Sequence, residues 1–217
     1  MKPRGKPIKW TPEIAYVVGL ITTNGCLSND GRHIIMRSSD IQQLKTFKKC
    51  LNLSNKISET KNDGWAKKPA YRVQFGNIIL YKWLLSIGLM PNKTKRIGSL
   101  KIPNKYFFDF LRGVLDGDGY IAKFQDSVYP NSQRLYIKFS SASLKHLKWL
   151  QKRIKYLLNI NGYIQKGTRT YVLIYAKKES LVMLPFLYPK RKIPCLQRKY
   201  EIVEPILRKK AEVVKSG

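Results

Sequence analysis

The chain has 217 residues, of which 43% are hydrophobic, so it is long and apolar enough to bury the core of one large domain or two small ones. Lysine and arginine together number 42 against 13 acidic residues, which gives a formal net charge of +29. Such an excess opposes compaction unless a polyanion neutralises it, so nucleic acid is the leading partner. The sequence holds no long uncharged apolar run and no concentrated basic amphipathic helix, and we therefore expect no membrane partner.

Cysteine usage and the start of the chain bear on the compartment. Cys26, Cys50 and Cys195 are far apart, with neither zinc spacing nor a disulfide framework, which is typical of a reducing environment. Residues 1–10 are basic and lack the apolar core of a signal peptide, so we interpret them as a loose arm. We expect an intracellular protein, in a bacterial cytoplasm or an organelle, and not a secreted one.

The first half of the chain alternates between helical and strand patterns. Thr11, Pro12 and Glu13 form a helix start, with a capping hydroxyl, a proline and an acid in the first turn. Apolar residues three and four apart predict further helices, and short alternating runs around Gly-containing turns predict strands. The expected elements are a helix at 12–23, strands at 26–28 and 32–38, a helix at 41–51, strands at 56–61 and 70–75, and a helix at 77–89.

The second half repeats this order. A helix ends at Asp118, and the elements that we expect after it are strands at 120–129 and 133–141, a helix capped by Ser143 to 158, strands at 162–166 and 169–175, a helix at 179–187 and a last helix at 196–210. The sequence thus predicts an α+β fold of two pseudo-symmetric αββαββα halves. We assign 1–10 to the arm, 11–98 to the first half, 99–104 to a linker, and 105–217 to the second half with its C-terminal helix.

An internal repeat lies at the start of each half. Residues 17–25 (VVGLITTNG) align without gaps with residues 111–119 (LRGVLDGDG). Because glycine costs about 1 kcal/mol in a helix interior, we interpret each copy as a helix that ends beside Asn24 or Asp118. At these motifs the chain resembles the single-chain LAGLIDADG homing endonucleases, and the resemblance runs from about Thr11 to Leu207.

The resemblance implies a fold and a function. The two motif helices would pair at the centre, with small residues at their contact, namely Gly19, Thr23, Gly113 and Gly117. The antiparallel sheets would form a saddle over double-stranded DNA with a long recognition site. The resemblance also implies a monomeric, often intron-associated meganuclease that hydrolyses phosphodiesters on both strands, with no small-molecule substrate.

Metal chemistry is implied at the end of each motif. Family members bind divalent cations, usually Mg²⁺, through the final acid of the motif, which would put a metal site at Asp118, Asn24 and the neighbouring Gly25 and Gly119. Asp116 we interpret as structural. The repeat also aligns Lys93 with Lys199, which are our candidates for the basic residue that the family keeps near each scissile phosphate. His33 and His146 have no Cys or His at metal spacing, so we expect no ligand role for them.

Asn24 departs from the family pattern, because an amide brings no negative charge to a cation. Either the chain is a cleavage-defective variant engineered from an aspartate at position 24, which we favour, or it is naturally asymmetric and nicks or has lost cleavage. Two other functions stay open on the same fold: an intron-splicing RNA maturase, and a DNA-binding regulator that does not cut.

DNA-reading residues are expected on strand faces, where they alternate with apolar partners. Arg and Gln on such faces pair with base edges, each contact worth about 1–3 kcal/mol of discrimination. The candidates are Arg32, Arg72, Gln74, Lys123, Arg134, Tyr136, Lys138, Ser140, Lys166 and Arg169.

Overall fold

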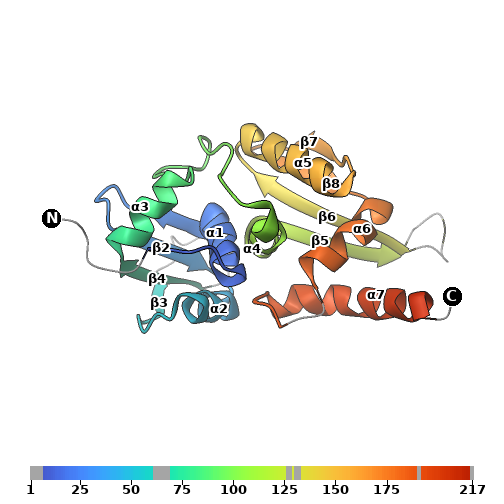
Figure 1. Ribbon diagram of the computed structural model, residues 1–217, viewed down its shortest axis with the longest axis horizontal. Helices are drawn as coiled ribbons and strands as arrows, with labels where there is room; N and C mark the ends of the chain where they lie inside the picture. The colour runs from blue at the N-terminus through green and yellow to red at the C-terminus, as the bar shows by residue number, and fades with distance from the viewer. Residues whose placement is uncertain (1–6, 61–68, 126–128, 130–132, 190–191, 216–217) are drawn as a thin grey trace.

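The computed structural model describes residues 7–60, 69–125, 129, 133–189 and 192–215, with side chains up to residue 208. Two halves with the same order of elements lie side by side, joined through the helices α1 and α4 at the centre (Figure 1). The α+β class and the αββαββα order predicted from the sequence are confirmed. In the described part of the chain no helix has both the length and the apolar character needed to cross a membrane.

The first half contains the elements α1 (Pro12–Asn24), β1 (Gly25–Leu27), β2 (His33–Ser38), α2 (Ile41–Leu51), β3 (Ser58–Thr60), β4 (Ala70–Gly76) and α3 (Ile78–Ser86). The expected helix start is confirmed, since the Thr11 side chain accepts a bond of 3.1 Å from the amide of Ile14. Asp40 caps α2 in the same way. The third helix was predicted to reach Leu89 but ends at Ser86, just before Gly88, whose φ of +106° is incompatible with a helix.

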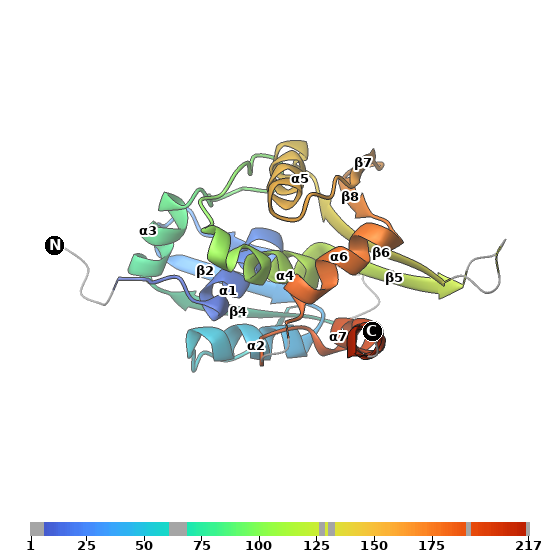
Figure 2. The ribbon, with the colours of Figure 1, turned by 45° about the vertical axis from the view of Figure 1, so that its right-hand side comes forward.

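A short 3-10 turn, η1 (Asn104–Tyr106), leads into the second half, which contains α4 (Phe107–Asp118), β5 (Gly119–Gln125), β6 (Gln133–Ser141), α5 (Leu144–Leu158), β7 (Tyr163–Lys166), β8 (Tyr171–Tyr175), α6 (Lys177–Leu187) and α7 (Gln197–Lys215). The last helix is longer than predicted, and its start lies beside α2 of the first half in both views of the ribbon (Figure 2). The turns expected at Asp63-Gly64 and Pro130-Asn131 lie outside the described residues.

Each half has one four-stranded antiparallel sheet, and the two sheets share one topology. The strand order is β1-β2-β4-β3 in the first half and β5-β6-β8-β7 in the second. Apolar residues of one face of each sheet are buried against the helices; Ile34, Met36, Val73 and Phe75 are at most 5% exposed in the first sheet. The other face of each sheet therefore carries the alternating exposed residues.

Close backbone contact joins α1 to α4. A Cβ built on Gly113 would lie 2.1 Å from the carbonyl oxygen of Tyr16, and one built on Gly19 would lie 2.2 Å from that of Phe110. A Cβ built on Gly117 would lie 1.9 Å from Oγ1 of Thr23. No larger side chain fits between these helices, so the glycines set how near the two halves approach.

Candidate nucleic-acid interface and dyad site

The C-terminal ends of α1 and α4 bring the two motifs together. Asn24 and Asp118 are the last residues of these helices, and Gly25 and Gly119 begin the strands β1 and β5. The Asn24 side chain reaches across the pair, because its Oδ1 is 3.2 Å from the position that a Cβ on Gly117 would take. Positions 24 and 118 therefore flank one dyad site at the ends of the paired helices.

The Asn24 amide is bonded on one side only. Its nitrogen donates to Oε1 of Gln43 at 3.4 Å. Its Oδ1 is buried and has no hydrogen-bond partner among the described residues. A buried oxygen acceptor without a donor is costly in protein alone, and it suits a cation or a ligand.

Asp118 is solvent-exposed and borders a pocket between the halves that is also lined by Thr22, Thr23, Lys93, Ser140 and His146. Neighbouring protein atoms desolvate its carboxyl and raise its pKa, while the ammonium groups of Lys93 and Lys199 act in the opposite direction. Two cations thus face a carboxylate for which the described residues offer no hydrogen bond. The group is available to a further ligand.

Lys93 and Lys199 are buried, at 8% and 3% exposure, and occupy corresponding places. The ammonium of Lys93 donates to the carbonyl oxygen of Gly25, and that of Lys199 donates to the carbonyl oxygen of Gly119 at 2.7 Å. Burial lowers the pKa of both amines, that of Lys199 to about 8. The two glycine carbonyls that we had included in the metal site thus each accept a hydrogen bond from a buried lysine.

Asp116 has a structural environment, in keeping with its interpretation from the sequence. Its Oδ2 accepts bonds from the hydroxyl of Tyr16 at 2.9 Å and from the amide of Leu196 at 2.7 Å. Burial raises its pKa to about 6. The carboxyl links α1, α4 and the segment before α7.

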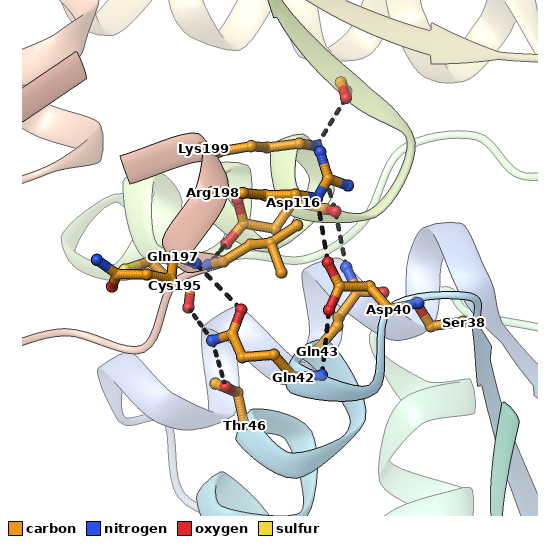
Figure 3. A network of polar contacts seen from close by, with 12 residues as sticks. Ser38, Asp40, Gln42, Gln43, Thr46, Asp116, Cys195, Gln197, Arg198 and Lys199 are labelled. Atoms are coloured by element: carbon orange, nitrogen blue, oxygen red, sulfur yellow. Dashed lines mark hydrogen bonds and ion pairs between the residues drawn. The ribbon is translucent and has the colours of Figure 1, made fainter. Parts of the chain in front are cut away.

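Figure 3 shows how α2 of the first half holds the segment that precedes α7 of the second. The Gln42 amide nitrogen donates to the carbonyl oxygen of Cys195 at 3.1 Å, and its Oε1 accepts from the amide of Gln197 at 3.1 Å. Arg198 pairs with Asp40 at 3.1 Å. This cross-half network sets the start of the helix that carries Lys199. Sequence reasoning missed Gln42 and Gln43, because nothing local marks a glutamine that bonds a distant segment.

The exposed face of the first sheet is polar and basic. Arg72 is paired with Arg37 across the strands, and Gln74 with Ile35. Arg72, Arg37 and Gln74 are all exposed. Two like charges directly opposite each other are unfavourable unless an anion neutralises them. Arg37 was missed from the sequence, although the burial of Ile34 and Met36 now fixes its side. Arg32 is exposed but precedes β2.

The corresponding face of the second sheet combines aromatic and basic residues. Arg134 is paired with Phe124, Tyr136 with Ala122, and Lys138 with Tyr120, so these side chains share one face. Phe124 stacks on Tyr136 with ring centroids 6.0 Å apart. Ser140 is on the same face, and Lys166 and Arg169 are exposed at the β7–β8 turn.

Lys123 is placed differently from the other candidates. It pairs with Leu135, which is 3% exposed and belongs to the face that packs on the helices. Lys123 is nevertheless exposed, on the edge strand β5. The structure therefore separates it from the basic sheet face.

A divalent metal fits the dyad only with help from its substrate. Within the described ranges no group of three or more His, Cys, Asp or Glu side chains is arranged to hold a metal. The available oxygens are those of Asp118 and Oδ1 of Asn24. Mg²⁺ is commonly held by one or two carboxylates, waters and substrate phosphates, so this donor set fits a cation that binds together with a phosphodiester backbone.

The comparisons with known proteins identify the fold. Residues 107–184 match the family model of a LAGLIDADG-like domain. The chain is similar to full-length DUF199/WhiA from Thermatoga maritima (17% identity over 96% of this chain and 71% of that one, TM-score 0.58). It is also similar to the LAGLIDADG homing endonuclease I-LtrWI bound to target DNA (15% identity, 90% and 89% coverage, TM-score 0.56). A third similarity is to the LAGLIDADG homing endonuclease I-GzeII in complex with its DNA target (15% identity over 94% of this chain and 92% of that one, TM-score 0.57). No curated protein sequence matches the chain.

These similarities and the geometry define a single-chain protein of two αββαββα halves paired through their motif helices. Residues 107–184 match a LAGLIDADG-like domain, and the chain as a whole has the fold of the LAGLIDADG homing endonucleases.

Proposed function

We propose that the chain is a monomeric, site-specific DNA-binding protein of the homing endonuclease type, with a dyad centre at Asp118 and Asn24. The observation that carries the proposal is that both residues end paired helices in a chain of net charge +29, beside sheets with exposed basic faces. A long duplex would neutralise Arg37 and Arg72 on one sheet and Arg134 and Lys138 on the other.

In this proposal each residue of the dyad has a distinct task. Asp118 and the Oδ1 of Asn24 would hold a divalent cation such as Mg²⁺ against the scissile phosphates, where it would activate water and stabilise the leaving oxygen. Lys93 and Lys199 supply positive charge on either side of the reacting phosphates. Because Asn24 carries no charge, the first-half site binds its cation more weakly, and we expect one strand to be cut faster than the other.

The test begins with selection of bound duplexes from a randomised pool, followed by cleavage of the selected site with each strand labelled. We expect nicking in the unmodified chain and a rise of at least tenfold in Mg²⁺-dependent double-strand cleavage on Asn24→Asp. Asp118→Asn should abolish cutting and keep binding. If Asn24→Asp leaves cleavage unchanged, the role given to position 24 is wrong.

A second function is supported by Asn24 itself, since one uncharged position in the dyad is what a protein that only binds would tolerate. The similarity to DUF199/WhiA concerns the fold alone and leaves this function open. A chain that binds the selected duplex but never cuts it, even after the change Asn24→Asp, would be a regulator. Preference for structured RNA over duplex DNA would indicate a maturase.

A further inference from the structure

Gln43 is the one side chain that contacts both position 24 and the opposite motif helix through hydrogen bonds in the described structure. It lies in the first turn of α2 and is 2% exposed. Its Nε2 donates to the carbonyl oxygen of Asp116 at 2.7 Å (Figure 3). Its Oε1 accepts from Nδ2 of Asn24 at 3.4 Å. One buried amide therefore joins both ends of the dyad.

The first of these bonds fixes the orientation of the second. Because a carbonyl oxygen accepts but cannot donate, Asp116 requires the nitrogen of Gln43 on its side. Oε1 must then face residue 24, where only a donor is favourable. Asn24 provides that donor and, by doing so, directs its own Oδ1 away from Gln43 toward α4. A carboxylate at position 24 would instead bring two acceptors together.

The second half differs at the equivalent position. The turns before α2 and α5 match: Ser38 Oγ accepts from the amide of Asp40 at 3.0 Å, and Ser141 Oγ accepts from that of Ser143 at 3.1 Å. Gln43 lies three residues after Asp40, the cap of α2, and His146 lies three residues after Ser143, the cap of α5. His146 is therefore the counterpart of Gln43. His146 borders the pocket that Asp118 borders, and its Nδ1 contacts the carbonyl oxygen of Gly98 at 2.8 Å. In the first half the amide of Gln43 faces the amide of Asn24. In the second half, which carries Asp118, the imidazole of His146 takes the place of Gln43.

We propose that Gln43 is a positioning residue that holds the Asn24 amide in one orientation and selects an amide over a carboxylate at position 24. The first-half site is then an amide site with a matched partner, so Asn24→Asp lowers the stability of the fold even though the added charge raises cleavage. The use of Asn24 Oδ1 as a cation ligand rests on the function proposed above, whereas the pairing of Gln43 with Asn24 does not.

A double-mutant cycle on the free protein tests the pairing without DNA or metal. The variants are Asn24→Asp, Gln43→Met and the two combined, followed by urea unfolding at neutral pH. We expect Asn24→Asp to reduce the folding equilibrium constant about tenfold more when Gln43 is present than when Met replaces it. If the two single effects simply multiply, the selection of an amide is refuted.

Gln42→Met is the matched control. Gln42 is adjacent on α2, and its amide also bonds two backbone groups, but these belong to Cys195 and Gln197. The substitution should weaken folding by itself and show no coupling to Asn24→Asp. Equal coupling for both glutamines would mean that the effect is general loosening of the cross-half network.

Two further measurements complete the test. Hydrogen exchange of the Asn24 side-chain amide in the unmodified protein should be slowed by its bond to Gln43; free-amide exchange would overturn the proposal even if the variants fail to fold. Mn²⁺ binding to the protein–DNA complex, followed by EPR, should weaken about 10-fold or more in Gln43→Met. It should not weaken in the control Gln151→Met, since Gln151 lies on α5 and its amide donates to the carbonyl oxygens of Asn161 and Gly162. Coupling in the double-mutant cycle together with unchanged Mn²⁺ binding would support the pairing of Gln43 with Asn24 and refute the role of Asn24 as a cation ligand.

Discussion

Lys93 and Lys199 hold equivalent positions in the two halves, since each ammonium donates to the carbonyl oxygen of the glycine that follows its motif helix. Both amines are buried, and the positive charge of each lowers the pKa of Asp118 against the effect of burial. Positive charge at the C-terminal end of a helix is favourable because the helix dipole is negative there. The two lysines thus place positive charge at the dyad before any phosphate arrives.

The buried Lys199 predicts a rise of stability at alkaline pH. Its pKa is lowered to about 8 from an ordinary 10.5, so between these values the folded protein binds fewer protons than the unfolded chain. The contribution of Lys199 to the free energy of unfolding should therefore increase with pH across that window. Burial raises the pKa of Cys50 and of Cys195, so these thiols act in the opposite direction from about pH 9 upward. Urea unfolding between pH 7.5 and 9 should therefore show a steeper rise in the unmodified protein and in the control Lys152→Met than in Lys199→Met. An equally steep rise in Lys199→Met would contradict the assignment of the lowered pKa to Lys199.

Asp116 and His146 predict opposing effects between pH 4 and 6. Burial raises the pKa of Asp116 to about 6, so the folded state retains a proton that the unfolded state loses, and stability falls as pH increases. Burial lowers the pKa of His146 to about 4, which makes stability increase with pH over the same range. Each effect is worth roughly 3 kcal/mol.

Single substitutions should separate the two effects. In His146→Asn the rise due to His146 is lost and the fall due to Asp116 becomes steeper in the profile, and in Asp116→Asn the fall due to Asp116 is lost and the rise due to His146 becomes visible. Unfolding monitored at half-unit pH intervals would reveal the two slopes. Identical profiles for the two variants would show that neither group has the environment described.

The contact of α1 with α4 predicts that Gly113→Ala is severely destabilising. The added Cβ would meet the backbone of Tyr16 at 2.1 Å, and backbone cannot move aside as a side chain can. We expect a loss of about 3 kcal/mol or more in the free energy of unfolding. Gly98→Ala is the matched control, because its Cβ would meet only the flexible side chain of Lys145. A small effect at position 113 would exclude the close helix pair.

The basic face of the first sheet predicts a salt-dependent contribution to DNA affinity. Removing one phosphate contact should reduce the slope of log affinity against log salt by about one, so Arg37→Gln and Arg72→Gln should each flatten it. Lys123→Gln removes the same charge from the opposite face of the second sheet and should leave the slope unchanged. Fluorescence anisotropy across a salt series checks this. A slope that responds equally to Lys123→Gln would refute the assignment of faces.

Much of the fold was predictable because its signals are local. Capping residues, apolar spacing and the two motif copies indicated the order of elements, and Thr11 caps α1 as expected. Lengths were less secure: the third helix stops three residues early because Gly88 adopts a positive φ.

The site was predictable only in part. The ends of the motif helices locate Asn24 and Asp118, since the repeat itself aligns them. The partners of these residues come from distant segments, and sequence spacing carries no record of such contacts. Gln43 and Gln42 were missed for that reason, and Lys123 was grouped with the DNA-facing residues because the sequence does not give the register that pairs it with buried Leu135.

The bonds that α2 makes to residues 195–198 have a consequence for the autonomy of the halves. Asp40 and Gln42 hold the beginning of α7, and Asp116 holds the amide of Leu196. A protease cut within residues 99–104 would therefore break the covalent chain without releasing two independent bodies. Neither fragment would keep a complete polar interior alone, and co-expressed fragments should reassemble into one particle.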